Sequence, residues 1–417
     1  MSDEHKQETQ ETRETVQQEM PEQWQEEEKR QDKQRRRLLA TQRARRILSL
    51  VVIVAIIVCV VLGIVFHDAL NFDQIRRSMA YRNLRSDENG TVETFTYNSD
   101  TSNIFDSFNG GLMVASSAGY TLFASNGAEL ASENVYLENP VVDSGDTLVV
   151  VFDAGGRELR GMDKKGLAFS LELDEDRGIF SARVNEDGWM ALTAQESGYK
   201  GAVTVYDEDH NRVFKWNSTS RFVSDAVVSE DGNWMAAVTM DTSDTAMDSA
   251  LVVYRLNSEE QYSSCPMGAL IPLDLRFDNT GIHIVGSSAC LNIDRDGSLK
   301  GRYSYGNYYL RDFSMDGDGF TALLLGKYRL GGGQSVLVLL NNKCEVIDTL
   351  TLEEEVVSIS AAGRYITVLY ADKLEIYTDN MALYSTYSGT GSARTALTRE
   401  DGSVLLASAD STRLYLP

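Results

Sequence analysis

Beyond residue 90, the chain repeats one pattern of hydrophobic and polar positions. Each unit starts with a strand of alternating apolar and polar residues, continues through a polar turn that ends in glycine, and then enters a short strand that is apolar at almost every position. The turn glycines are Gly111, Gly145, Gly188, Gly232, Gly281, Gly319, Gly363 and Gly402. This regular spacing of about 40 residues predicts a repeat architecture.

Each unit then adds a third strand, a tight turn and a fourth strand, as at 203–216 and 374–387. Four short strands per unit are typical of the blade of a β-propeller. A single four-stranded sheet has two apolar faces and cannot bury both, so blades stack around an axis until the ring closes. We therefore predict an all-β, eight-bladed propeller over residues 90–417. A seven-bladed ring remains the alternative if one unit is misread.

The two ends of this region predict how the ring closes. The chain stops at STRLYLP, which has the pattern of a third strand, so the eighth blade lacks its fourth strand. The segment TVETFTY at 91–97 alternates β-branched and aromatic residues just before the first blade. We expect it to complete the eighth blade, which would tie the two ends together and leave no open sheet edge.

A different pattern precedes the propeller. Residues 47–66, ILSLVVIVAIIVCVVLGIVF, are 20 residues without a charge, and a helix of that length is about 30 Å long, the thickness of the hydrocarbon core. No small-x-small cleavage site follows, so we predict an uncleaved signal anchor. Basic residues are more frequent before it than after it, which predicts a cytoplasmic amino terminus and an extracytoplasmic propeller in the cell membrane. Residues 1–46 are expected to be a charged tail, disordered or helical, and residues 67–89 a stalk.

The net charge of -23 is unevenly distributed. Residues 1–46 contain equal numbers of basic and acidic side chains, so the whole excess lies beyond them. Such an excess repels phosphate backbones, which excludes nucleic acid as a partner. Neutral, cationic or metal-bridged partners remain compatible with it.

Four segments carry a resemblance to known propellers: NEDGWMAL at 185–192, SEDGNWMAA at 229–237, MDGDGFTALL at 315–324 and REDGSVLLAS at 399–408. They resemble the WD-repeat-like and quinoprotein-like superfamily, although the Trp-Asp dipeptide of true WD repeats is absent. Tail, span and propeller together resemble an uncharacterised family of membrane-anchored propeller proteins of Gram-positive anaerobic bacteria. The resemblance implies fold and location but no assigned activity.

Candidate chemistry is sparse. The propeller contains only His210 and His283, and the chain has no Gly-x-Ser-x-Gly elbow, so serine hydrolase chemistry is not expected. The acidic turns at 207–211 and 292–297 fall where hairpin turns are required, and we expect no metal and no cofactor. With Cys59 in the predicted span, Cys265, Cys290 and Cys344 are expected to be buried free thiols, with a bridge between Cys265 and Cys290 as the alternative.

Longer connections between second and third strands occur at 195–200, 240–249 and 327–334. In a propeller these connections share one face with the loops that join blades, which suggests that this face binds a partner. The candidate partner-binding residues are Asp241, Asp244, Asp248, Tyr308, Tyr309, Tyr328 and Arg329. We predict a non-enzymatic binding or scaffolding propeller that docks an envelope protein or a wall-derived ligand. The alternatives are a carbohydrate-active enzyme with acidic residues at the channel and a transmembrane ligand sensor.

Overall fold

The computed structural model describes residues 91–417, apart from 99, 101, 244, 245 and 330–332, together with residues 53, 54, 57 and 77. The predicted tail and most of the predicted span and stalk lie outside the described residues. Within the described part, no helix is long and apolar enough to cross a membrane. The strands of residues 91–417 form eight four-stranded antiparallel sheets, so the prediction of eight blades is confirmed.

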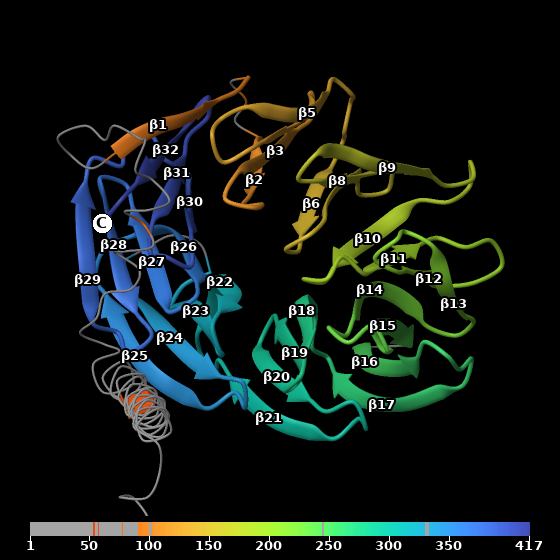
Figure 1. Ribbon diagram of the computed structural model, residues 1–417. Helices are drawn as coiled ribbons and strands as arrows, with labels where there is room; N and C mark the ends of the chain where they lie inside the picture. The colour runs from red at the N-terminus through yellow and green to blue at the C-terminus, as the bar shows by residue number, and fades with distance from the viewer. Residues whose placement is uncertain are drawn as a thin grey trace, which may run out of the picture. The chain divides into compact units, whose positions relative to one another are not determined.

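The sheets are arranged radially, with the first strand of each blade innermost (Figure 1). The first strands are β2 (Ile104–Asp106), β6 (Pro140–Ser144), β10 (Ile179–Val184), β14 (Phe222–Val228), β18 (Pro272–Asp278), β22 (Tyr309–Gly317), β26 (Val356–Ala362) and β30 (Thr395–Thr398). The second strands are β3 (Leu112–Ser116), β7 (Val149–Asp153), β11 (Met190–Ala194), β15 (Trp234–Ser243), β19 (Gly281–Gly286), β23 (Phe320–Gly326), β27 (Tyr365–Tyr370) and β31 (Val404–Ala407).

The two outer positions of each blade complete the sheets. The third strands are β4 (Gly119–Phe123), β8 (Glu158–Asp163), β12 (Gly201–Tyr206), β16 (Ala246–Arg255), β20 (Ala289–Ile293), β24 (Ser335–Asn341), β28 (Lys373–Thr378) and β32 (Ser411–Tyr415). The fourth strands are β5 (Glu129–Glu133), β9 (Gly166–Glu172), β13 (Arg212–Ser218), β17 (Gln261–Gly268), β21 (Leu299–Ser304), β25 (Val346–Leu352), β29 (Leu383–Ser388) and β1 (Thr91–Thr96).

The core lies between neighbouring blades. The second strand β19 and the third strand β20 are buried at every position. One cluster joins Val238 and Leu251 of the fourth blade to Leu275 and Ile284 of the fifth, as expected for sheets that bury both faces by stacking. Gly232, one of the repeated turn glycines, has a φ of +62°, and a Cβ atom there would lie 2.5 Å from the ring of Trp189.

The ring closes as predicted. β1 pairs antiparallel with the third strand β32, from Thr91 opposite Tyr415 to Thr96 opposite Ser411. Phe95 is buried, and its ring centroid lies 5.5 Å from that of Phe123 in the first blade. Because the strands β1 and β32 share one sheet, the closure joins residues more than 300 positions apart in the sequence.

The chain enters the propeller on one particular side. We call the side with the second-to-third connections and the blade-joining loops the loop-rich face, and the side with the first-to-second turns the opposite face. Arg77 is buried on the opposite face, where its Nη1 donates to the carbonyl of Asp401 at 2.9 Å and its Nη2 to the Tyr384 hydroxyl at 2.6 Å. Arg77 is therefore held on the opposite face.

Two local predictions have different outcomes. The prediction that 240–249 is a loop is wrong, because β15 and β16 continue through it as a paired hairpin, with Met240 opposite Ser249 and Asp241 opposite Asp248. The segment has no Gly or Pro to interrupt pairing. The prediction of buried free thiols is confirmed for Cys265, Cys290 and Cys344.

Candidate functional site

The predicted acidic residues at 240–249 lie on the extended hairpin. The Asp248 carboxylate forms an ion pair with Arg221 (Nη1 to Oδ2, 3.0 Å), and Arg221 also donates to the Asp248 carbonyl at 2.8 Å. Asp241, directly opposite Asp248, accepts the backbone N–H of Thr242 at 2.8 Å. Asp244 lies outside the described residues. The Arg221 contacts relieve the repulsion between two facing carboxylates and hold the hairpin to the blade.

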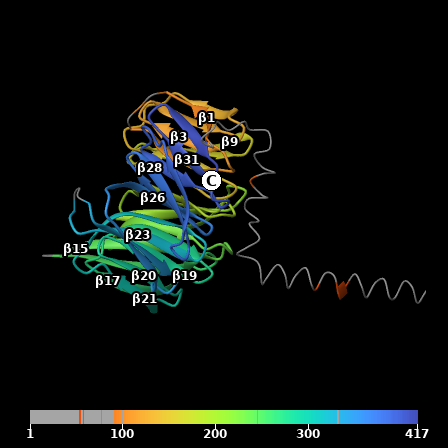
Figure 2. The same cartoon turned by 90° about the vertical axis from the view of Figure 1, so that its left-hand side faces the viewer.

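The predicted aromatic and basic residues gather on the sixth blade. Tyr308 and Tyr309 are exposed at the start of β22, and Tyr328 and Arg329 are exposed in the loop between β23 and β24. Tyr309 pairs with Gly326, the last residue before that loop, so the two segments meet at one corner of the blade. The hairpin of the fourth blade and this loop extend from the same side of the ring (Figure 2). Asp241 and Asp248 therefore share a face with the tyrosines but not a single site.

Sequence analysis missed a set of exposed apolar side chains near the starts of the first strands. Phe222, Ile271 and Leu273 are 48%, 44% and 47% exposed. We define the apolar rim as these residues together with Phe180, Val357 and the two predicted tyrosines, all exposed on the loop-rich face: Phe180, Phe222, Ile271, Leu273, Tyr308, Tyr309 and Val357. Large apolar side chains that are exposed together on one face of a folded domain are typical of an interaction surface.

A repeated β-bulge sets the direction of some side chains of the apolar rim. In five consecutive blades, the first strand skips one residue in its pairing with the second strand. The skipped residues are Phe180, Ser224, Leu273, Arg311 and Val357. A bulge of this kind re-aims the side chain at its position. In the sequence, each skipped residue directly precedes an Asp or Ser of the first strand. The alternation of apolar and polar residues does not distinguish this position from its neighbours.

Below the rim, charged residues from four blades meet at the channel. Arg183 of β10 forms ion pairs with Asp143 of β6 (3.1 Å), Asp225 of β14 (3.0 Å) and Asp274 of β18 (2.9 Å). We call these four residues the channel cluster. One guanidinium thus links the inner strands of the second, third, fourth and fifth blades.

A cavity of about 240 Å³ lies over the channel cluster. Its polar lining comes from the cluster with Ser181 and Ser224. Its apolar lining includes Val141, Phe180, Pro272 and Leu273. Since Phe180 and Leu273 also belong to the apolar rim, the cavity and the rim are continuous on the loop-rich face.

Comparison with known sequences finds a family match but no curated relative. Residues 83–265 match DUF5711, a family of unknown function. No curated protein matches the chain in sequence.

Solved structures of similar fold are WD40-type and related propellers. The C-terminal WD40 domain of Sif2 aligns with a TM-score of 0.54 at 12% identity, over 78% of this chain and 99% of that domain. BamB from Moraxella catarrhalis aligns with a TM-score of 0.49 at 12% identity, over 78% of this chain and 98% of its own. The resemblance to WD-repeat-like propellers is thus confirmed at the level of the fold.

The electrostatics of the channel differ from those of an exposed acidic surface. Burial raises the pKa of Asp143 from its usual 3.8 to about 7, although Arg183 opposes the shift. Burial likewise raises the pKa of Asp106, at the end of β2, to about 6. Burial by itself would lower the pKa of Arg183, but the carboxylates of Asp225, Asp274 and Asp143 raise it well above its usual value. The guanidinium therefore stays charged, whereas the Asp143 carboxyl beside it titrates close to neutrality.

These shifts predict that the propeller loses stability as the pH rises. Between the usual aspartate pKa and about pH 7, the folded state binds more protons at Asp143 and Asp106 than the unfolded chain does. The free energy of unfolding should therefore fall by about 2 kcal/mol from about pH 5.5 to about pH 8. Urea unfolding at a series of pH values measures it. The variant Asp143→Asn should flatten the profile, and a wild-type stability that rises over this range would contradict the account.

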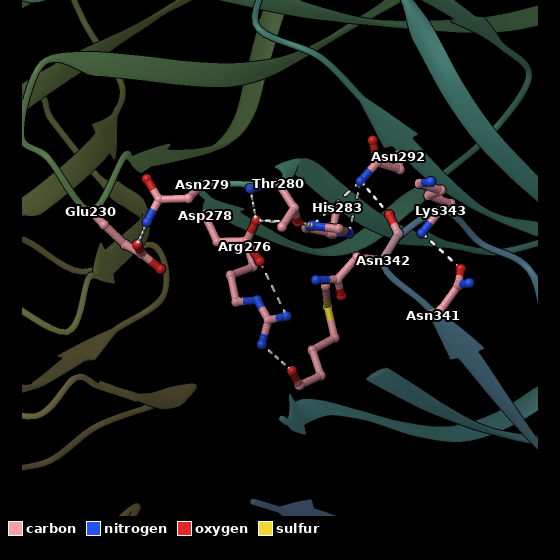
Figure 3. Close-up of polar contacts among 11 residues, drawn as sticks. Glu230, Arg276, Asp278, Asn279, Thr280, His283, Asn292, Asn341, Asn342 and Lys343 are labelled. Carbon is pink, nitrogen blue, oxygen red and sulfur yellow. Dashed lines mark hydrogen bonds and ion pairs between the residues drawn. The ribbon is translucent and has the colours of Figure 1, made fainter. Parts of the chain in front are cut away.

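A second polar group lies on the opposite face (Figure 3). His283 Nε2 is 2.8 Å from the Thr280 hydroxyl oxygen and 3.1 Å from Asp278 Oδ1, and Asn292 donates to the carbonyl of Asn342 at 2.5 Å. These contacts connect the fifth blade to the sixth. The Thr280 hydroxyl also donates to Asp278 at 2.6 Å, so His283, Thr280 and Asp278 together hold a turn here. Among the described residues, no three His, Cys, Asp or Glu side chains are grouped to hold a metal ion.

Proposed function

We propose that this propeller is a non-enzymatic binding module that docks a protein partner on its loop-rich face. The observation that carries the proposal is the apolar rim, which is continuous with a cavity at the channel through Phe180 and Leu273. Exposed Phe, Tyr, Ile and Leu side chains favour a protein over a wall-derived sugar, because they offer little hydrogen bonding and a large area of apolar contact. Tyr328 and Arg329 extend this surface with residue types that are frequent at the centres of interfaces.

The channel supports binding over catalysis. Carboxylates from different blades do converge there, as the alternative of a carbohydrate-active enzyme requires. Glycoside hydrolysis needs two carboxyl groups that face the sugar from opposite sides, one of them protonated. Here Asp143, Asp225 and Asp274 all form ion pairs with the same guanidinium instead of facing one another as a pair across the cavity. The alternative of a ligand sensor depends on residues 1–46, which lie outside the described residues.

We place the propeller on the outer side of the cell membrane, with residues 47–66 as its anchor. The support is the length of that charge-free segment and the basic residues before it. Arg77, which follows this segment in the sequence, binds the opposite face. An anchor that leads into this face would leave the loop-rich face free to meet a partner.

A crosslinking pull-down from cells tests the docking face. The rim variant combines Phe222→Ser, Ile271→Ser and Leu273→Ser. The matched variant combines Leu167→Ser, Leu299→Ser and Leu383→Ser, whose side chains are 56%, 49% and 57% exposed on outer strands. We expect the rim variant to reduce recovery of the partner by about tenfold or more, because several central apolar contacts are lost together, whereas the matched variant retains it. Unchanged recovery with the rim variant, or equal losses in both, would count against the proposal.

A further inference from the structure

We infer that the cavity over the channel cluster receives a basic side chain of the docked partner, a lysine or an arginine, with Asp274 Oδ2 as its main acceptor. This inference rests on the proposed function, because it specifies what the partner inserts at the centre of the loop-rich face. Three features of the cavity support it: a free acceptor, the balance of charge and the apolar walls.

The hydrogen-bond partners of the three carboxylates show which oxygen of the channel cluster is a free acceptor. The second oxygen of Asp143 accepts the backbone N–H of Val184 at 2.6 Å, and that of Asp225 accepts the N–H of Ala226 at 2.9 Å. Asp274 Oδ1 binds Arg183 and accepts the N–H of Leu275, but Oδ2 has no hydrogen-bond partner among the described residues. The Asp274 side chain is 29% exposed and lines the cavity, so a ligand can reach this oxygen.

The balance of charge selects a cation. Three carboxylates face one guanidinium, which leaves an excess of two negative charges when all three are ionised. An anion would be repelled, and a neutral group would leave the excess uncompensated at a site where burial makes it costly. A calcium ion needs six to eight oxygen ligands, and Arg183 already occupies the centre of the carboxylates. An ammonium or guanidinium group needs only one or two of these acceptors.

The apolar walls of the cavity favour a cation carried on a long apolar side chain. Val141, Phe180, Pro272 and Leu273 surround the approach to the cluster with apolar surface. Lysine and arginine side chains have apolar stems that pack along such walls while their charged ends reach polar partners. A neighbouring apolar residue of the partner would then contact the apolar rim. The fitting ligand is therefore a basic residue beside an aromatic or aliphatic one.

Two dipeptides test this inference on the full-length chain purified in detergent. N-acetyl-phenylalanyl-lysine amide is the probe, and N-acetyl-phenylalanyl-norleucine amide is its matched control, with nearly the same stem and no ammonium. In ligand-observed NMR titrations, we expect the lysine peptide to bind about tenfold more tightly. Asp274→Asn should abolish most of this difference while leaving norleucine binding unchanged.

The control variant is Asp312→Asn. Asp312 holds the equivalent position on β22, just after the skipped residue, but it does not line the cavity. This variant should keep the preference for lysine. Equal affinities of wild type for the two peptides would overturn the inference without use of any variant, and so would an unchanged preference in Asp274→Asn. If the rim variant loses the partner while the two peptides bind equally, the docking face stands and only the basic insertion fails.

Discussion

Replacing Arg183 with alanine should lower the free energy of unfolding by about 3–5 kcal/mol, the usual cost of removing one partner from a buried ion pair. The side chain joins four inner strands through three carboxylates. Without it, Asp143, Asp225 and Asp274 would face one another in a partly buried site, and their repulsion would push the blades apart. Urea unfolding at about pH 8 measures the loss.

The control for this variant is Arg157→Ala. Arg157 pairs with Glu172 at 3.4 Å on the surface, and exposed pairs of this kind contribute less than about 1 kcal/mol. The Arg183→Ala variant should also regain part of its stability at about pH 5.5, because Asp143, whose pKa burial raises to about 7, becomes protonated and the repulsion falls. If both variants lose the same amount, or if acidification does not help Arg183→Ala, the channel cluster does not hold the ring.

Phe95→Ala should have a comparable effect through the closure of the ring. Phe95 is 2% exposed and packs with Leu112 and Phe123 of the first blade and Leu414 of the eighth. Truncation of a buried phenylalanine costs about 3–5 kcal/mol through lost contacts and the cavity left behind. Here the loss falls at the single sheet that joins the two ends of the propeller. Thermal unfolding followed by circular dichroism is the measurement.

The matched variant for the closure is Thr96→Ala, the next residue of β1, whose side chain is exposed. It should change the unfolding temperature little, since it removes no buried contact. Phe95→Ala should also make the first and eighth blades more sensitive to protease than the fourth and fifth. Similar behaviour of the two variants would mean that β1 contributes little to closure.

The ring was predictable because its elements are local. A short apolar strand after a glycine turn marks the second strand in every unit, and the missing fourth strand of the last blade pointed to the segment at 91–97. Both features depend on periodicity and turn chemistry, which a single sequence displays. The prediction of a loop at 240–249 is wrong because the length of a connection does not distinguish a loop from an extended hairpin. Met240, Thr242 and Met247 continue the two strands here, since no Gly or Pro interrupts them.

The site could be predicted only in part. The exposure of Tyr308, Tyr309, Tyr328 and Arg329 on the loop-rich face follows from their positions near strand ends. The channel cluster could not be found in the same way, because Asp143 and Arg183 are 40 residues apart and meet only when separate blades face one channel. Phe180, Leu273 and Val357 of the apolar rim could not be predicted either, because a skipped residue in the pairing of the first and second strands changes which side chain faces outward.

A photo-crosslinking amino acid incorporated in cells tests the docking face most directly. Tyr309 on the apolar rim and Tyr262 on the outer strand β17 are 49% and 46% exposed, so each can be replaced by benzoyl-phenylalanine with a similar change in volume and exposure. We expect position 309 to yield one dominant crosslinked protein that position 262 does not yield. Recovery of the same protein from position 262, or no protein from position 309, would contradict the assignment of the loop-rich face.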